Sequence, residues 1–262
     1  MVTPSKENTC LLLVACVNPK RYNPFSSKKR ETHYIDVLRY YLESDAEIGV
    51  GGIVFAENSG YPLGKFKSLP NPRNKRIEFI SFECSYPESM PGSVRKGYGE
   101  LLIINEAIKR SALLKNAVYI AKLNGRIKLL NINELLKSVK RPFELLCDVK
   151  DHGWVFRRLQ GVKTANPYCD TRFLVFTKNF ASSYLSEAHK TVAGKIVFLE
   201  TYLYDLIKNP DLCGKIIKRF PIEPYFCGLS GSFKGVRYDS RLGNMVRPIR
   251  NFLRHITPWL HI

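Results

Sequence analysis

Lysine and arginine stand at the end of an apolar run near the middle of the chain. Lys122 lies in that run, Asn124 ends it, and Gly125 and Arg126 follow directly. Cationic side chains in a crevice hold a diphosphate, and the planar guanidinium does so through two parallel hydrogen bonds. A solvated β-turn with two surface cations explains the same residues equally well, so sequence alone leaves both interpretations open.

A second candidate phosphate site opens a predicted helix. Lys96, Gly97 and Gly99 stand at its start, where glycine lets the backbone approach a ligand and free N–H groups favour an anion. Glu100 follows in the first turn. This carboxylate fits either a residue that offsets the helix dipole or a general base that also binds sugar hydroxyls. The G-x-x-x-x-G-K-[ST] spacing does not occur, which excludes a Walker loop.

Acidic residues in the second half of the chain do not form a metal-binding dyad. Asp148, Asp151 and Asp170 are separated in sequence, and Arg172 follows the last of them. Separated carboxylates either bind a metal or act as a base. The sequence has no D-x-D pair, and Arg126 stands after the strand where such a pair would be expected. Fixed cations can neutralise a leaving diphosphate in place of an ion, so we expect no divalent metal and no cofactor.

Three further polar residues are candidates for substrate contact. Glu200 follows four apolar residues in a predicted helix, where a carboxylate at the rim of the core is the more common finding. Ser230 and Ser232 lie in a glycine-rich loop that fits phosphate or sugar contact, or a plain turn. The histidines show no ligand spacing, and neither a G-x-S-x-G elbow nor a G-x-G-x-x-G after the first strand occurs. A hydrolase or a dinucleotide-binding dehydrogenase therefore lacks its usual support.

The elements that would position these residues alternate between strand and helix. Apolar runs predict strands over 9–17, 52–56, 77–82, 118–123, 127–131, 143–149 and 172–177, and 215–240 is β-like. Amphipathic spacing predicts helices over 31–42, 98–114, 133–139, 180–189 and 192–208. This order is typical of an α/β fold with a mostly parallel sheet flanked by helices. Ligands of such sheets bind at the carboxyl ends of the strands, which here carry 18–19, 57–59 and 124–126.

Composition suits one domain with a strongly basic surface. The chain has 262 residues, is 45% hydrophobic and carries a net charge of +18. That charge favours an anionic partner, which can be nucleic acid, an anionic membrane or a phosphorylated substrate. The seven cysteines include no C-x-x-C pair, so we expect reduced thiols in a cytoplasmic protein and not a zinc ribbon. No apolar run fits a signal peptide or a transmembrane helix.

The end of the chain has a character of its own. We expect a single domain over 1–240 followed by a basic, amphipathic C-terminal tail over 241–262. In this tail Phe252, Ile256, Trp259 and Leu260 can share one side, and cations stand between them. The pattern fits an interfacial anchor for an anionic bilayer, and it fits equally a last helix packed on the domain.

Five short motifs occur in order along the chain. They are Glu57-Asn58-Ser59-Gly60-Tyr61, Lys96-Gly97-Tyr98-Gly99-Glu100, Lys122-x-x-Gly125-Arg126 with Asn131, Asp170-Thr171-Arg172-Phe173 and Gly228-x-Ser230-Gly231-Ser232. Their order and spacing, from residue 9 to about 240, resemble small glycosyltransferases of bacterial O-antigen and capsular polysaccharide biosynthesis. The resemblance implies a GT-A-like sheet, a nucleotide-sugar donor such as a UDP-hexose, and a lipid-linked glycan acceptor. We therefore expect a hexosyltransferase, peripheral at the inner face of the cell membrane.

The expected reaction is direct displacement at the anomeric carbon. Glu100 or Asp170 would deprotonate the acceptor hydroxyl. The remaining candidates are donor and phosphate contacts at Glu57, Asn58, Ser59, Lys96, Gly97, Lys122, Gly125, Arg126 and Arg172, and acceptor contacts at Glu200, Ser230 and Ser232. Two other functions stay open: a nucleic-acid-binding protein or metal-dependent nuclease using Asp148 and Asp151, and a non-catalytic lipid- or glycan-binding module.

Overall fold

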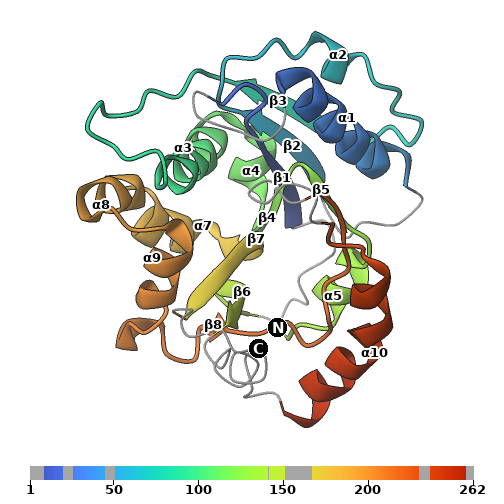
Figure 1. Ribbon diagram of the computed structural model, residues 1–262, viewed down its shortest axis with the longest axis vertical. Helices are drawn as coiled ribbons and strands as arrows, with labels where there is room; N and C mark the ends of the chain where they lie inside the picture. The colour runs from blue at the N-terminus through green and yellow to red at the C-terminus, as the bar shows by residue number, and fades with distance from the viewer. Residues whose placement is uncertain are drawn as a thin grey trace.

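In the residues that the structure describes, seven strands form one sheet with helices on both faces (Figure 1). The computed structural model describes residues 9–19, 26–44, 51–140, 142–150, 167–229 and 237–257. Across the sheet the strands are β3 (Ile77–Ser81), β2 (Gly52–Glu57), β1 (Thr9–Ala15), β4 (Tyr119–Asn124), β7 (Tyr168–Thr177), β6 (Leu145–Lys150) and β8 (Ile216–Ile217). The first four are parallel, β7 is antiparallel to both of its neighbours, and β8 is parallel to β6. The prediction of a mostly parallel sheet flanked by helices is confirmed.

Strand β1 shows why both faces are covered, since every residue of its sequence TCLLLVA is buried. Leu12 and Val14 pack into a cluster with α3 (Arg95–Arg110), α4 (Ala112–Asn116), α8 (Ala188–Lys195) and α9 (Leu199–Leu206). Leu11 and Leu13 face the other way, toward α1 (Ser27–Glu43), α2 (Gly64–Lys67) and α5 (Ile132–Lys137). Figure 1 shows α3, α8 and α9 on one side of the sheet and α1 and α5 on the other. Such two-sided burial is typical of parallel strands.

Helix ends follow local capping. The Ser26 side chain accepts a hydrogen bond from the Lys29 N–H and starts α1 four residues earlier than the apolar pattern predicts. The predicted helix over 98–114 is two helices, because Ser111 has extended backbone and its Oγ caps α4 at the Leu114 N–H, 3.0 Å away.

Two predicted elements differ from the structure. The predicted strand over 127–131 is the shorter β5 (Ile127–Leu129), which begins a new strand and pairs with β9 (Phe226–Gly228) in a second sheet. The predicted helices over 180–208 are broken into α7 (Lys178–Phe180), a π-helical turn at Ala181–Leu185, α8 and α9. Helix α8 ends because Ile196 adopts φ of 50°, a left-handed conformation that β-branched residues rarely take.

The last described helix is α10 (Arg241–Ile256), of which the side chains of 241–244 are not described. Arg254 fixes it to the sheet, donating two hydrogen bonds of 3.1 Å to the Asp148 carboxylate on β6. The division of the chain at residue 240 stays a prediction. None of the described helices has the length and apolar composition that crossing a bilayer requires.

Candidate functional site

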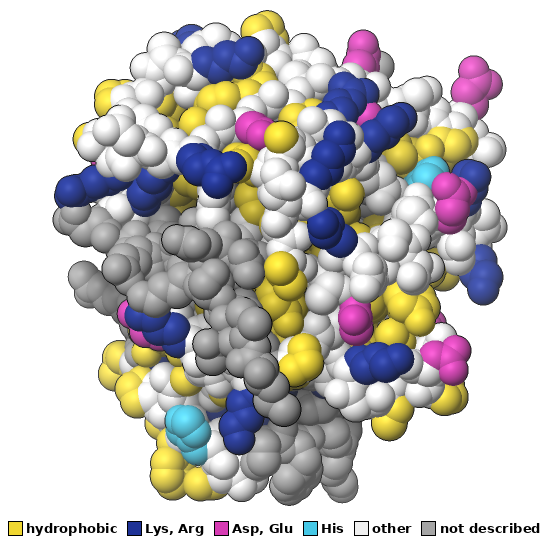
Figure 2. Space-filling view, turned by 180° about the vertical axis from the view of Figure 1, so that it is seen from behind, with side chains coloured by type: hydrophobic (Ala, Val, Ile, Leu, Met, Phe, Trp, Pro, Cys, Tyr) yellow, Lys and Arg dark blue, Asp and Glu magenta, His cyan; other side chains and the backbone are white. Residues whose placement is uncertain are grey.

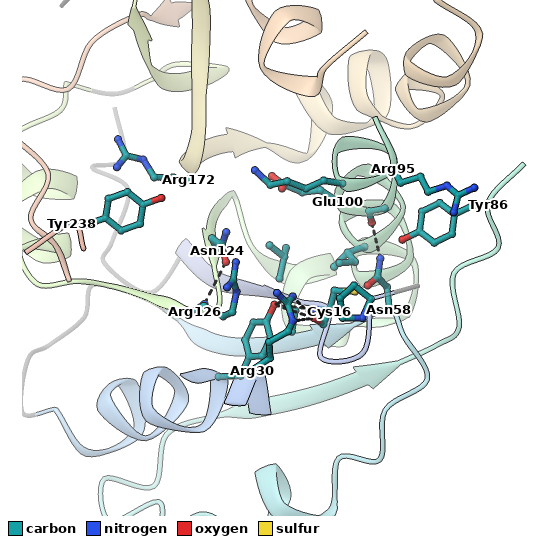
Figure 3. A pocket seen from close by; sticks show the side chains of 17 residues that line it. Cys16, Arg30, Asn58, Tyr86, Arg95, Glu100, Asn124, Arg126, Arg172 and Tyr238 are labelled. Atoms are coloured by element: carbon teal, nitrogen blue, oxygen red, sulfur yellow. Dashed lines mark hydrogen bonds between the residues drawn. The ribbon is translucent and has the colours of Figure 1, made fainter. Parts of the chain in front are cut away.

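A pocket opens at the carboxyl ends of β1, β2 and β4, where the first two turns of α3 meet them (Figure 3). Its volume is about 830 Å³, including the part that is open to solvent. Pro19 and Asn58 line it from the loops after β1 and β2, and Asn124 lines it from the last position of β4. This is the position at which parallel sheets bind ligands. The three strand-end segments singled out in the sequence therefore meet at one pocket.

The pocket is strongly cationic. Among its described lining residues, five are cationic and Glu100 is the single carboxylate. The five are Arg30, Arg95, Lys96, Arg126 and Arg172. Figure 3 shows Arg30 and Arg126 together, Arg172 with Tyr238 at one end, Arg95 with Tyr86 at the other, and Glu100 between the two ends. Such a charge distribution favours an anionic ligand, and guanidinium groups favour phosphate in particular.

Arg126 is buried, and two of its hydrogen-bond donors have no partner. Its side chain is nine-tenths buried, and Nε and Nη1 have no hydrogen-bond partner. Burial lowers the pKa of its guanidinium, and the charge of Arg30 adds to that decrease. A buried donor without a partner costs about 1–3 kcal/mol, and more when it is charged. A bound anion would remove this cost. Asn58, which also lines the pocket, has a buried Oδ1 without a hydrogen-bond partner, and a ligand hydroxyl could donate to it.

Lys122 does not line the pocket. It is completely buried, and its ammonium group donates to the Glu100 carboxylate and to the Thr171 carbonyl. A direct contact between Lys122 and a diphosphate is therefore not supported by its position. Lys122 instead holds Glu100, which does line the pocket, in a fixed orientation from below.

Asp170 and Arg172 form a pair in which Arg172 alone lines the pocket. Arg172 Nε lies 2.9 and 3.0 Å from the two Asp170 oxygens, and its backbone N–H donates to the same carboxylate at 2.9 Å. The guanidinium lies over the rings of Phe226 and Tyr238, with centroids at 4.4 and 4.8 Å. Burial alone would raise the pKa of Asp170, but Arg172 outweighs it and lowers that pKa to about 2. A carboxylate this acidic is a poor general base, and Glu100 is the candidate of the two that lines the pocket.

The Asp170 pair predicts a specific loss of stability in acid. The ordinary pKa of this carboxyl is 3.8 and its folded value is about 2. The pair therefore stabilises the fold above about pH 4, by about 2 kcal/mol, and this contribution is lost as the pH falls from 4 to 2. Urea unfolding of the wild type and of Asp170→Asn between pH 2 and 5 measures it: the stability difference between the two proteins should shrink as the pH falls. A difference that stays constant over this range would contradict the assigned pKa.

Glu57 organises the loops below the pocket and does not line it. Its buried carboxylate accepts hydrogen bonds from the backbone N–H groups of Val17, Ser59 and Tyr61 at 2.9–3.0 Å, and from the Ser59 hydroxyl. Ser59 Oγ in turn accepts from the Asn18 N–H at 2.9 Å. These bonds tie the loop after β1 to the loop after β2. Asn58, between Glu57 and Ser59, reaches the pocket and donates to the Gly99 carbonyl at 3.2 Å.

The glycines are needed mainly for packing. A Cβ at Gly97 would lie 2.8 Å from the Leu199 Cβ, so this glycine allows α3 to lie against α9. Gly97 does not line the pocket, whereas Gly99 does, and a Cβ there would lie 2.9 Å from the Asn58 Nδ2. A Cβ at Gly125 would lie 3.0 Å from the Val14 carbonyl oxygen. Close packing therefore explains Gly97 and Gly125 without a bound phosphate.

Lys96 and Glu200 connect α3 and α9 at the edge of the pocket. The Lys96 ammonium lies 3.4 Å from Glu200 Oε1, which also accepts a hydrogen bond of 3.2 Å from Thr171 Oγ1. Burial would lower the pKa of Lys96, but the carboxylates of Glu200 and Glu100 outweigh it and raise that pKa. Lys96 lines the pocket and Glu200 does not. Ser230 and Ser232 lie outside the described residues.

Sequence reasoning missed the contribution of α1. Arg30 is buried and donates to the Cys16 carbonyl at 2.9 Å through Nε, and to the Tyr34 hydroxyl at 3.2 Å. Tyr34 lies under Arg126, whose guanidinium carbon is 5.9 Å from the ring centroid. Arg30 and Tyr34 are four residues apart, one helical turn, and that spacing was the available signal. Arg95, Tyr86 and Tyr238 also line the pocket.

Of the two carboxylates suggested for a nuclease, the structure describes Asp148. Asp148 is buried and accepts a hydrogen bond from Arg254. Burial alone would raise the pKa of Asp148, but the charges of Lys150 and Arg254 outweigh this effect and lower that pKa. Asp151 lies outside the described residues. Across the described part of the chain, no three His, Cys, Asp or Glu side chains lie close enough to hold a metal ion. Metal-independent chemistry itself stays a prediction.

Surface charge is scattered. Figure 2 shows lysine and arginine side chains spread over this face and interrupted by acidic and apolar groups. A nucleic-acid-binding face would carry its cations as a continuous stripe or patch. On the face that Figure 2 displays, the described side chains do not form one.

The sequence matches no protein-family model and no curated protein. Several solved structures resemble the fold. The galactosyltransferase LgtC, solved with donor and acceptor sugar analogues, is 14% identical with a TM-score of 0.48, covering 79% of this chain and 72% of that chain. A putative nucleotide-diphospho-sugar transferase from Desulfovibrio desulfuricans G20 is 10% identical with a TM-score of 0.48, covering 95% and 97%.

A third solved structure carries a different activity in its name. The 4-diphosphocytidyl-2C-methyl-D-erythritol synthase from Anaerococcus prevotii DSM 20548 is 8% identical with a TM-score of 0.43, covering 93% of this chain and 98% of that chain. Similarity at this level concerns the arrangement of strands and helices and does not distinguish between reactions. The chemistry of this chain has to be argued from its own pocket.

Proposed function

We propose that this protein transfers a sugar from a nucleoside-diphosphate sugar to an acceptor hydroxyl. The observation that carries the proposal is the buried guanidinium of Arg126, with two unpaired nitrogens in a pocket lined by four other cations. A diphosphate supplies the charge and the acceptor oxygens that this arrangement lacks. The pocket lies at the carboxyl ends of the parallel strands, where α/β sheets bind their ligands.

The reaction would be a direct displacement. The Glu100 carboxylate takes the proton of the acceptor hydroxyl, and the acceptor oxygen forms a bond to the anomeric carbon of the sugar. The bond from that carbon to the diphosphate oxygen breaks, and its electron pair leaves with the nucleoside diphosphate. Arg126, Lys96 and Arg172 stabilise the departing charge from fixed positions. The proposal includes metal-independent chemistry, because these cations offset the charge that a divalent ion would otherwise neutralise.

The finer assignments are part of the same proposal. The donor is a UDP-hexose and the acceptor is a lipid-linked glycan of O-antigen or capsular polysaccharide biosynthesis, as the five sequence motifs imply. Such an acceptor would place the enzyme in the cytoplasm, peripheral at the inner face of the cell membrane. The support for these assignments is the order of the motifs together with the cationic pocket.

The test is thermal and chemical stability with UDP, GDP and CMP, each with and without EDTA. A ligand at 100 times its dissociation constant stabilises the native state by about 2.7 kcal/mol. We expect UDP to stabilise the wild type in EDTA and to lose this effect in Arg126→Gln. Arg110→Gln is the matched control, since Arg110 is half-exposed at the far end of α3.

The other outcomes separate the alternatives. Stabilisation that EDTA abolishes would retain the nucleotide site and overturn metal independence. Stabilisation by a short oligonucleotide alone, with steep salt dependence, would favour the nucleic-acid-binding function. Equal stabilisation of the wild type and Arg126→Gln by UDP would overturn the phosphate-binding role of Arg126.

A further inference from the structure

Helix α10 exposes an apolar stripe. Met245, Ile249, Phe252 and Ile256 have exposed fractions of 74%, 60%, 62% and 54%. Their spacing of four, three and four residues places them on one side of a helix. Single exposed apolar residues are ordinary, but four aligned along a helix make a continuous surface.

The opposite side of α10 is fixed to the domain. Arg254 is buried and donates to Asp148 at 3.1 Å and to Glu223 at 2.8 Å. Arg247 lies over the Tyr225 ring at 3.8 Å from its centroid. The stripe therefore does not turn inward, and Figure 1 shows α10 at the periphery of the molecule, on the side away from α8 and α9.

The positive charge of α10 favours an anionic partner. Residues 241–256 contain four arginines and no acidic residue. Of the described arginines, Arg250 is 57% exposed, with its guanidinium 3.5 Å from Glu223, whereas Arg247 and Arg254 contact the domain. A helix with an apolar side, an exposed cation and no acidic residue fits the interface of an anionic bilayer.

A second copy of this chain fits the stripe less well. Stable protein interfaces engage about 20–30 residues on each side, far more than one row of four side chains. A two-fold pairing would also bring two arginine-rich helices together, and their like charges would repel. A single helix with a row of apolar side chains is enough for an interfacial contact with lipid.

We propose that α10 docks this protein on an anionic lipid surface, with Met245, Ile249, Phe252 and Ile256 entering the headgroup–acyl boundary and arginine contacting lipid phosphates. The proposal does not depend on sugar transfer. Helix α10 begins three positions after Tyr238, which lines the pocket. A docked α10 thus holds the rim of the pocket close to the membrane, where a lipid-linked substrate would be found.

Vesicle sedimentation of the full chain tests the proposal. Vesicles of phosphatidylcholine alone are compared with vesicles that contain phosphatidylglycerol as well. We expect the wild type to partition into the anionic vesicles, and the double variant Ile249→Ser/Phe252→Ser to lose about tenfold or more in partition coefficient. The matched control is Phe198→Ser, because Phe198 is 54% exposed and lies outside α10.

Three results would overturn the proposal. The first is an equal loss of vesicle binding in Phe198→Ser and in the double variant. The second is equal partitioning into neutral and anionic vesicles, which would remove the role of charge. The third is an absence of vesicle binding together with a dimer that the double variant dissociates, which would assign the stripe to a second copy. Circular dichroism of each variant confirms that it folds, so a loss of binding is attributable to the surface.

Discussion

Lys122→Met is expected to lower the free energy of unfolding by about 3–5 kcal/mol, the range for breaking a buried ion pair from one side. Lys122 is completely buried and Glu100 is 7% exposed, so the variant leaves a carboxylate without its partner in a poorly hydrated place. Methionine fills a similar volume, which keeps the loss of packing small. Urea unfolding with linear extrapolation measures the change.

The double variant Lys122→Met/Glu100→Gln isolates the charge from the packing. It carries no buried ion, so we expect it to regain much of the stability lost in Lys122→Met. If Lys122→Met alone stays within about 1 kcal/mol of the wild type, the buried pair is not a significant contributor. That outcome would also weaken the view that Lys122 holds Glu100 in place.

Glu100→Gln is expected to reduce kcat by about 10²–10⁴-fold, the usual contribution of a general base. Glutamine keeps an oxygen that can accept from Lys122 but cannot take a proton from the acceptor. Affinity for the nucleotide should stay unchanged or increase, because the variant removes the single described carboxylate from a cationic pocket. The measurement is the initial rate with the donor that the binding experiment identifies, together with the dissociation constant of its nucleotide.

Glu200→Gln is the matched control for this prediction. Glu200 contacts Lys96 and Thr171 but does not line the pocket, so the same change there removes the partner of Lys96 and no base. We expect kcat to fall far less in Glu200→Gln than in Glu100→Gln. Unchanged kcat in Glu100→Gln with folded protein and normal nucleotide binding would remove Glu100 from the reaction. A large loss of kcat in Glu200→Gln would instead assign the general base to Glu200 on α9.

Continuous apolar runs predicted the centre of the sheet well. β1, β2 and β4 lie where the sequence indicated, because a parallel strand buried on both faces requires such a run. The sequence does not indicate strand pairing where a distant partner decides it. Nothing in residues 127–129 indicates that they pair with Phe226–Gly228, almost one hundred residues later, and not with a neighbour of β4. The left-handed Ile196 that ends α8 is equally invisible, because its side chain favours the opposite conformation.

At the pocket, sequence reasoning identified the right strand ends but not which side chains face inward. Arg126 and Glu100 line the pocket, while Lys122, Glu57 and Asp170 lie behind it and orient other groups. A residue that contacts a ligand and a residue that orients another side chain can have the same type and spacing in the sequence. Only the packing of the folded chain distinguishes the two. Arg30 was missed because its place depends on how α1 lies against the loop after β1.

The rings that hold Arg172 connect two remote parts of the chain by thermodynamic linkage. Arg172 comes from β7, whereas Phe226 and Tyr238 lie more than fifty residues later. An anion that binds more tightly when the Arg172 guanidinium contacts these rings must, by reciprocity, strengthen the contact between Arg172 and the rings by the same factor. The contacts of Arg172 with Phe226 and Tyr238 are therefore energetically part of the pocket, and one coupling free energy links the loss of these contacts to the affinity for phosphate.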